Sequence, residues 1–306
     1  MAQLLSTITE RREISKRMWE VIADKISQTT GQAFQVREHR SVGGGCINQG
    51  YRISNGEHYY FVKLNQASQV TMFEAEILGL KRMWETRTIR VPEPICFGTI
   101  QHSSYIVLEW LDLGGRGSSQ SWHTMGEQLA AMHRDSGSGK FGFEVNNTIG
   151  STPQINIWTD NWVEFWQEHR IGYQLKLAKS KGGNFPLANQ ILAAIPRLLA
   201  GHDPQPSLVH GDLWGGNASV TGEGEPVIFD PATYFGDREV DLAMTELFGG
   251  FSGAFYQGYN EVWPMPEGYE RRKTLYNLYH ILNHFNLFGG GYAVQANRMM
   301  EQLLRN

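Results

Sequence analysis

The spacing of apolar residues changes along the chain, and the first pattern is helical. Between Ile14 and Ile26 apolar side chains recur every three to four residues, which predicts an amphipathic helix that ends near Gly31. The same spacing predicts a second helix over residues 68–84, before Pro92.

Between these two helices the period is that of β-strands. Residues 34–37 alternate, and the runs 50–53 and 58–64 flank the dipeptide Asn55-Gly56. Because a type I′ turn needs positive φ at both central residues, this dipeptide predicts a tight hairpin. Two further short strands are expected, over 95–100 and 105–110.

Beyond the Gly/Ser-rich stretch 112–121 helical patterns dominate. Helices are expected over 122–134, 162–178, 187–200, 239–248 and 269–305, the last with a break at 289–291. The predicted class is therefore α+β with two lobes. Residues 1–112 form a small antiparallel β-sheet lobe with one key helix, and residues 113–306 form a larger, mainly helical lobe.

Composition narrows the functional classes. The 306 residues are 41% hydrophobic, and 31 acidic residues face 27 basic ones, which argues against nucleic-acid binding. Residues 1–16 do not resemble a signal peptide, and no apolar run approaches the roughly 18 residues of a membrane span. Cys46 and Cys96 lack metal-site spacing. We expect a cytoplasmic protein, a monomer or a weak dimer.

The segment His210-Gly211-Asp212 follows a short apolar run, and Asn217 comes five residues after Asp212. Phosphoryl transfer requires a carboxylate that orients the attacking hydroxyl and accepts its proton, and oxygen ligands that hold magnesium on the phosphates. Asp212 is the candidate for the first role and Asn217 for the second.

A glycine-bearing turn, residues 221–224, separates Asn217 from Asp230. If this segment is a hairpin, the residue that enters it and the residue that leaves it lie side by side, because antiparallel strands are about 4.8 Å apart. Asn217 and Asp230 would then meet at one metal ion. The alternative is that Asp230 only begins a turn before Pro231.

A strand lysine and a helix glutamate complete the expected ATP site. Lys63 lies in the second strand of the predicted hairpin, and the next helix carries Glu74 and Glu76. In kinases of this type the lysine contacts the α- and β-phosphates and the glutamate holds the lysine. We prefer Glu76, although helical phase leaves Glu74 open.

Gly43, Gly44 and Gly45 precede the hairpin and match neither G-x-G-x-x-G nor the Walker A pattern. Their position would let backbone N–H groups approach phosphate. Cys46 lies in the same loop, where an exposed thiol could serve as a redox switch.

The motifs resemble those of known families. The strings 210–213, 227–232 and 236–243 are similar to the aminoglycoside and choline phosphotransferase branch of the protein-kinase-like fold. More narrowly, the chain resembles the fructosamine kinase (ketosamine-3-kinase) family, in the strings 72–76, 147–154, 213–217, 234–239 and 247–251.

This resemblance implies a bilobal kinase fold that uses ATP and Mg2+ to phosphorylate the 3-hydroxyl of ketosamines. Such fructosamine or ribulosamine adducts form on small amines or on protein lysines, and phosphorylation leads to deglycation. The family pattern makes Asp212 the catalytic base, Asn217 and Asp230 the metal ligands, and Lys63 with Glu76 the phosphate pair.

The resemblance also implies that Glu109, Trp110 and Leu111 form the hinge that offers backbone hydrogen bonds to adenine. Asp241 would brace the catalytic loop. Asp230 is followed by Pro231 rather than by the Phe-Gly of protein kinases, and nothing like a long activation loop follows.

Substrate contacts are expected in the helical lobe. The candidates are Trp214, which could stack on the sugar, and Asn283 and His284, which could bind its hydroxyls. The pair His280 and His284 has i,i+4 spacing but no third ligand in the sequence, so a zinc site is not expected.

Two other functions stay open. The same residues could serve a phosphotransferase for another small alcohol, of the aminoglycoside, choline or homoserine type. The chain could also be a pseudokinase that binds nucleotide as a scaffold, although Lys63, Asp212, Asn217 and Asp230 are all present.

Overall fold

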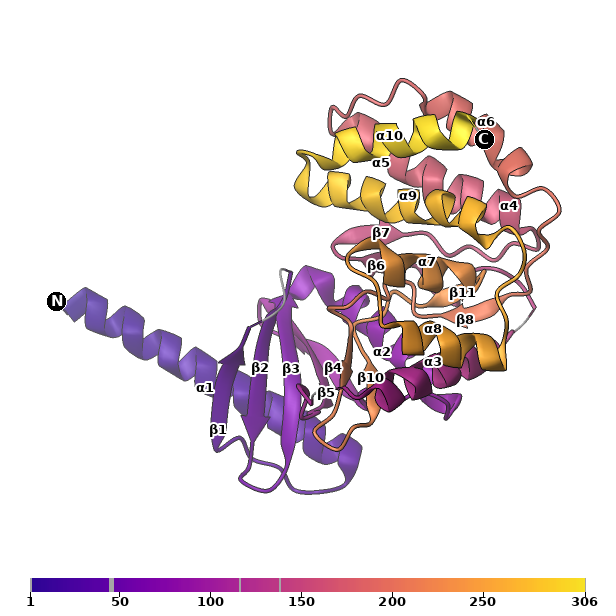
Figure 1. Cartoon of the computed structure of the whole chain (residues 1–306). Helices are drawn as coiled ribbons and strands as arrows, with labels where there is room; N and C mark the ends of the chain where they lie inside the picture. Colours follow the sequence, from indigo (N-terminus) through magenta and orange to yellow (C-terminus); the bar gives the residue numbers. More distant parts are fainter. Residues whose placement is uncertain (1, 44–46, 116, 138, 306) are drawn as a thin grey trace. The chain divides into compact units, whose positions relative to one another are not determined.

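A computed structural model describes residues 2–43, 47–115, 117–137 and 139–305, with side chains from Lys16 onward. The chain forms two compact units (Figure 1). The first comprises Met1–Lys81 with Pro92–Leu111, and the second comprises Arg82–Val91 with Asp112–Asn306.

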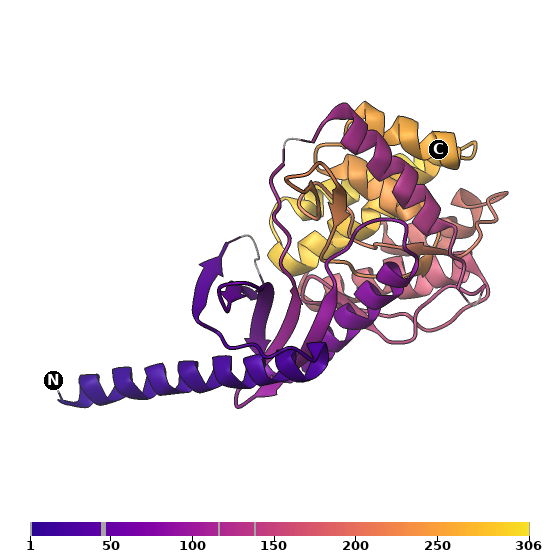
Figure 2. The same cartoon turned by 90° about the horizontal axis from the view of Figure 1, so that it is seen from below.

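The first unit is built on a five-stranded antiparallel sheet in the order β1-β2-β3-β5-β4. Its strands are β1 (Glu38–Val42), β2 (Gln49–Ser54), β3 (Tyr59–Gln66), β4 (Pro94–Ile100) and β5 (Ser103–Glu109). Helix α1 (Ala2–Thr30) packs on one face of this sheet through Trp19, Ile22 and Ile26. The first turns of α1 extend beyond the sheet (Figure 2).

Strand alternation separates the two faces of β3. Val62 and Leu64 belong to the apolar cluster beneath α1. Lys63, between them, therefore points to the opposite face. There it meets helix α2 (Val70–Glu85), which follows the short 3₁₀ turn η1 (Ala67–Gln69). The predicted helix over residues 68–84 is thus present.

Two details of the predicted strands are wrong. The β2–β3 hairpin is present, but only Gly56 has positive φ, at +100°, because Asn55 accepts hydrogen bonds from the N–H groups of Glu57 and His58. The turn is therefore not type I′. Residues 34–37 are not a strand, because Phe34 is buried beneath α1 and donates its N–H to Ser27 Oγ.

The second unit is mainly helical. Its helical elements are α3 (Ser119–His133), α4 (Trp162–Phe165), the π-helical turns η2 (Trp166–Gly172), α5 (Tyr173–Ser180), α6 (Ala188–Leu198), α7 (Glu239–Leu247), α8 (Gly253–Val262), α9 (Tyr269–Phe288) and α10 (Tyr292–Arg305). Three two-stranded ladders complete it: β6 (Asn147–Ile149) with β7 (Thr152–Gln154), β8 (Ser207–Val209) with β11 (Tyr234–Gly236), and β9 (Ala218–Val220) with β10 (Pro226–Ile228). None of the described helices is long and apolar enough to cross a membrane.

Helix α9 packs against several elements of the second unit, including α10, α7 and α5. Trp162 and Trp166 are buried and pack against Tyr276, with ring centroids 6.1 and 5.0 Å apart. Neither tryptophan is available to a ligand.

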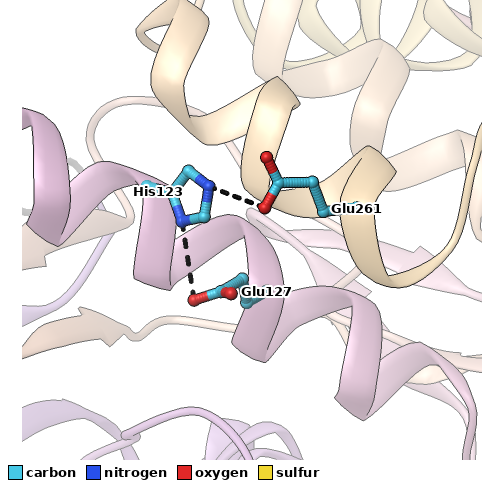
Figure 3. Close-up of side chains that lie close together, drawn as sticks. All are labelled: His123, Glu127 and Glu261. Carbon is cyan, nitrogen blue, oxygen red and sulfur yellow. Dashed lines mark hydrogen bonds and ion pairs between the residues drawn. The ribbon is translucent and has the colours of Figure 1, made fainter.

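Helices α3 and α8 approach closely because each has a glycine at their contact. A Cβ on Gly126 would lie 2.0 Å from the carbonyl oxygen of Phe255, and one on Gly258 would lie 2.1 Å from that of His123. His123 itself lies between two carboxylates, with Nε2 3.1 Å from Glu261 and Nδ1 3.5 Å from Glu127 (Figure 3). Since each ring nitrogen faces a different carboxylate, we interpret this cluster as polar contacts rather than as a metal site, and the contact of His123 with Glu261 joins the two helices.

Replacing Gly258 by alanine should destabilise the protein. The added methyl meets backbone rather than a movable side chain, so we expect a loss of about 1–3 kcal/mol in the free energy of unfolding. Gly253, in the same helix, has open space at its Cβ position. Gly253→Ala should therefore change stability by less than about 0.5 kcal/mol. Equal effects of the two substitutions in urea denaturation would contradict this account.

Candidate active site

Two short ladders hold the two polar loops of the second unit. The loop 210–217 connects β8 to β9, and the turn 229–233 connects β10 to β11. Strand β8 pairs with β11, and β9 pairs with β10. The start of the loop 210–217 therefore lies next to the end of the turn 229–233, and the end of the loop lies next to the start of the turn. The β9–β10 hairpin was predicted from its turn, whereas the β8–β11 ladder was not.

The two candidate residues of the first loop are in contact. Asn217 is buried, and its Nδ2 donates to the main-chain oxygen of Asp212 at 2.9 Å and to its carboxylate at 3.2 Å. Burial and the negative charge of Asp230 raise the pKa of Asp212 to about 7. Since the amide nitrogen of Asn217 donates its hydrogen bonds to Asp212, the amide oxygen of Asn217 is the atom that can bind a cation.

Asp230 reaches the same place through the hairpin. The N–H of Phe229 donates to the main-chain oxygen of Asn217 at 3.0 Å, which continues the β9–β10 ladder by one pair. Asp230 follows directly and adopts a positive φ of +57°, unusual for a residue other than glycine. The structure therefore brings Asp230 next to Asn217, as the turn chemistry predicted, and Asp212 lies close enough for the charge of Asp230 to raise its pKa.

A buried carboxylate shapes the start of the first loop. Asp241, in α7, accepts hydrogen bonds from the N–H groups of His210, at 2.7 Å, and Gly211, at 2.8 Å. Nε2 of His133 lies 3.0 Å from the same carboxylate. Burial alone would raise the pKa of Asp241, but the hydrogen bond and charge of His133, together with His210 and the N–H of Gly211, outweigh burial and lower the pKa.

In the first unit Lys63 forms an ion pair with Glu76. Nζ lies 2.7 Å from Oε1, and both side chains are at most 10% exposed. Glu74 is exposed on the same helix. The structure thus selects Glu76 from the two glutamates that helical phase left open.

The other candidates of the first unit are less fully described. Gly43 follows β1 and is exposed, while Gly44, Gly45 and Cys46 lie outside the described residues. Glu109 ends β5 and donates its N–H to the main-chain oxygen of Glu93. A contact of this residue with adenine would therefore have to use its carbonyl group.

Trp110 and Leu111 follow Glu109 and are half-buried. The Trp110 ring lies 6.4 Å from that of Phe61, and the guanidinium of Arg52 lies 5.4 Å from its centroid. Both residues come directly after the sheet, where a hinge is expected.

Trp214 is held in place yet 40% exposed. A Cβ on Gly216 would lie 2.3 Å from the Trp214 ring, so the indole packs against this glycine. On another side it meets Phe248, with ring centroids 6.4 Å apart. Such an exposed but fixed aromatic ring is a suitable surface for a sugar.

The two polar substrate candidates differ in position. Asn283 is 2% exposed and lies within the core. Its Oδ1 accepts a hydrogen bond from Gln174, and its Nδ2 donates to the main-chain oxygen of Ile149. His284 is half-buried and contacts Phe248, with ring centroids 4.9 Å apart. Burial lowers the pKa of His284, which favours its neutral form. Nδ1 faces the main-chain oxygen of His280 at 2.8 Å.

Sequence reasoning missed His133 and Phe248. His133 reads as an ordinary core histidine of a helix, and only the folded chain shows its contact with Asp241. Phe248 lies in a string used for the family resemblance, but no feature of the string indicated that its ring would meet Trp214.

Comparison with known proteins agrees with the motifs. The sequence profile described as fructosamine kinase matches residues 18–306. A "probable ketoamine kinase" from Synechocystis is 60% identical over 287 residues, covering 94% of this chain and 97% of the relative. The protein named protein-ribulosamine 3-kinase, chloroplastic, from Arabidopsis thaliana is 45% identical over 282 residues, covering 90% and 86%.

Solved structures show the same relationship. A crystal structure from Haemophilus somnus, provisionally named fructosamine-3-kinase, matches with a TM-score of 0.87 and 32% identity, covering 92% of this chain and 96% of that one. An aminoglycoside phosphotransferase, APH(4)-Ia, matches with a TM-score of 0.60 and 16% identity over 93% and 97%, which shows the kinase-like α+β fold alone. The chain therefore belongs to the fructosamine kinase family.

Proposed function

We propose that this protein transfers the γ-phosphoryl group of ATP to the 3-hydroxyl of a ketosamine. The observation that carries the proposal is the cluster of Asp212, Asn217 and Asp230, held by paired ladders and by Asp241. Relatives named ketoamine kinase and ribulosamine 3-kinase support the choice of acceptor. The acceptor oxygen would form a bond to the γ-phosphorus as the bond to the ADP oxygen breaks.

Asp212 is the group that would accept the hydroxyl proton. A general base works best when its pKa lies near the working pH. Burial and the neighbouring Asp230 raise the pKa of Asp212 to about 7. The hydrogen bond from Asn217 to its carboxylate fixes the direction in which Asp212 can accept that proton.

Asn217 and Asp230 would hold magnesium. Magnesium prefers oxygen ligands, and this pair offers an amide oxygen and a carboxylate. The fit is supported by the proximity of the carboxylates of Asp212 and Asp230, whose mutual repulsion a cation would relieve. Bound there, magnesium would neutralise the charge of the phosphates. Lys63, oriented by Glu76, would contact the α- and β-phosphates.

Trp214 would form the surface on which the ketose lies. Its ring is held by Gly216 and Phe248 before any substrate arrives, so little conformational freedom would be lost on binding. His284 lies next to Phe248, and because its Nδ1 donates to the main-chain oxygen of His280, Nε2 of the neutral ring could accept a hydrogen bond from a sugar hydroxyl.

Replacing the proposed base tests the function. Asp212→Asn keeps the size of the side chain but cannot accept the proton, so kcat should fall about 10²–10⁴-fold while ATP still binds. We would measure steady-state rates with fructosyl-, ribulosyl- and psicosyl-amines and read the phosphorylated position by phosphorus NMR. Aminoglycosides, choline and homoserine serve as control acceptors. Turnover of one of these without turnover of any ketosamine would refute the proposal, and ATP binding without turnover would indicate a pseudokinase.

The two glutamates of α2 give a matched pair. Glu76→Gln removes the charge that holds Lys63, so the KM for ATP should rise about tenfold or more. Glu74→Gln changes an exposed residue of the same helix and should leave the KM within about twofold. The reverse order of effects would show that the pairing is misassigned.

The glycines beside Trp214 give another pair. Gly216→Ala places a methyl group against the indole and should displace it, which raises the KM for the ketosamine about fivefold for a loss of about 1 kcal/mol of stacking. Gly215 has open space at its Cβ position, so Gly215→Ala should leave this KM nearly unchanged. An unaltered KM in Gly216→Ala would argue against Trp214 as the sugar surface.

A further inference from the structure

The β6–β7 hairpin contains the string Asn147–Gln154, to which the proposed mechanism gives no role. Gly150, with a φ of +62°, forms its turn, and the register places Asn147 directly opposite Gln154. Gln154 Nε2 donates to Asn147 Oδ1 at 2.8 Å. The two amides therefore act as one hydrogen-bonded unit.

This amide pair reaches the turn that carries Asp230. Gln154 Nε2 donates to the main-chain oxygen of Ala232 at 3.0 Å, and Asn147 Nδ2 donates to that of Thr233 at 2.8 Å. These are successive carbonyl groups, two and three residues after Asp230. Gln154 and Thr233 are both 1% exposed, whereas Asn147 is half-buried, so water cannot readily replace the donor group of Gln154.

The catalytic loop lies against the same segment. The N–H of Ala232 donates to the main-chain oxygen of His210 at 2.9 Å. Gly211, with a φ of +82°, is so close that a Cβ there would lie 2.2 Å from the Ala232 oxygen. Ala232 is therefore hydrogen-bonded both to the loop of Asp212 and to Gln154.

The amide pair is itself held from behind. Asn156 Nδ2 donates to Asn147 Oδ1 at 2.9 Å, and Arg170 Nη2 donates to Asn156 Oδ1 at 2.8 Å. The hydroxyl of Tyr279 donates to Gln154 Oε1 at 2.6 Å. These partners define which end of each amide is oxygen and which is nitrogen.

Arg170 lies in the π-helical turns η2 and is fully buried. Its guanidinium lies 4.0 Å from the ring centroid of Tyr234, the residue after Thr233. In the described part of the chain no carboxylate lies within ion-pair distance of it. A buried cation is costly unless its hydrogen bonds are satisfied, so Arg170 is expected to hold Asn156 firmly.

We propose that Asn147 and Gln154 are positioning residues that set the place of the Asp230 carboxylate relative to Asp212 and Asn217. Asp230 has a strained positive φ, and the hydrogen bonds to the two carbonyl groups after it help to hold this conformation, together with the contacts of Phe229 before it. The inference rests on the proposed role of Asp230 as a magnesium ligand. Because the pair supports a ligand without touching the metal, it should control metal affinity more than sugar binding.

The test is metal binding by Gln154→Met, which keeps the length of the side chain but removes its hydrogen bonds. We would titrate Mn2+ by electron paramagnetic resonance with a non-hydrolysable ATP analogue present. The Kd for Mn2+ should rise about tenfold, the range found when a residue behind a metal ligand is lost. The KM for the ketosamine should stay within about twofold.

Asn286→Leu is the matched control. Asn286 is also a buried amide of the second unit, 3% exposed and bonded to Gln174, but it does not contact the turn. Its replacement should lower stability and leave the Kd for Mn2+ unchanged. If Gln154→Met does not fold, Asn147→Asp serves, because it removes the donor to Thr233 and keeps the acceptor for Gln154.

Three outcomes would overturn the inference. The first is that Gln154→Met binds Mn2+ as the wild type does, whereas Asp230→Asn abolishes binding. In that case the positioning role is refuted and the metal assignment survives. Equal weakening by Asn286→Leu would show a general loss of stability instead of positioning. Unchanged Mn2+ binding in Asp230→Asn would remove both the metal assignment and the inference that depends on it.

Discussion

The buried carboxylate of Asp241 is the interaction on which the candidate site depends. It accepts the N–H groups of two successive residues, His210 and Gly211, which would otherwise be buried without partners. Each such unsatisfied group costs about 1–3 kcal/mol. The bonds also fix the backbone where Gly211 takes its positive φ, and so decide the direction in which the chain enters Asp212. The contact with His133 helps to lower the pKa of Asp241, so a helix far away in sequence contributes to the same constraint.

The rest of the candidate site in the second unit is held by only two short β-ladders. Two ladders of three residues per strand bring the loop of Asp212 and the turn of Asp230 together, and the backbone contact of Ala232 with His210 joins them. Burial away from water and then repulsion by the carboxylate of Asp230 raise the pKa of Asp212. The same proximity favours a divalent cation. One arrangement of backbone thus supplies the features that both a base and a metal site need.

The first unit holds Lys63 at a defined place. Because side chains alternate along β3, Val62 and Leu64 are buried under α1, whereas Lys63 points toward α2 and forms an ion pair with Glu76. The long helix α1 therefore matters to the site although none of its described side chains was a candidate. Its packing decides which face of the sheet is left for the lysine.

Local chemistry in the sequence determined the β9–β10 hairpin, the strand of Lys63, the helix of Glu76 and the proximity of Asn217 to Asp230, because each follows from turn residues or from periodicity within about 15 residues. The motif strings determined the family. Only the tertiary structure showed that Glu76 rather than Glu74 pairs with Lys63, that Asn283 is buried in the core, and that Phe248 contacts Trp214. It also connected Asn147 and Gln154 to the turn after Asp230. These contacts join residues up to 134 positions apart. They depend on how helices and ladders pack, which no local pattern of residues encodes.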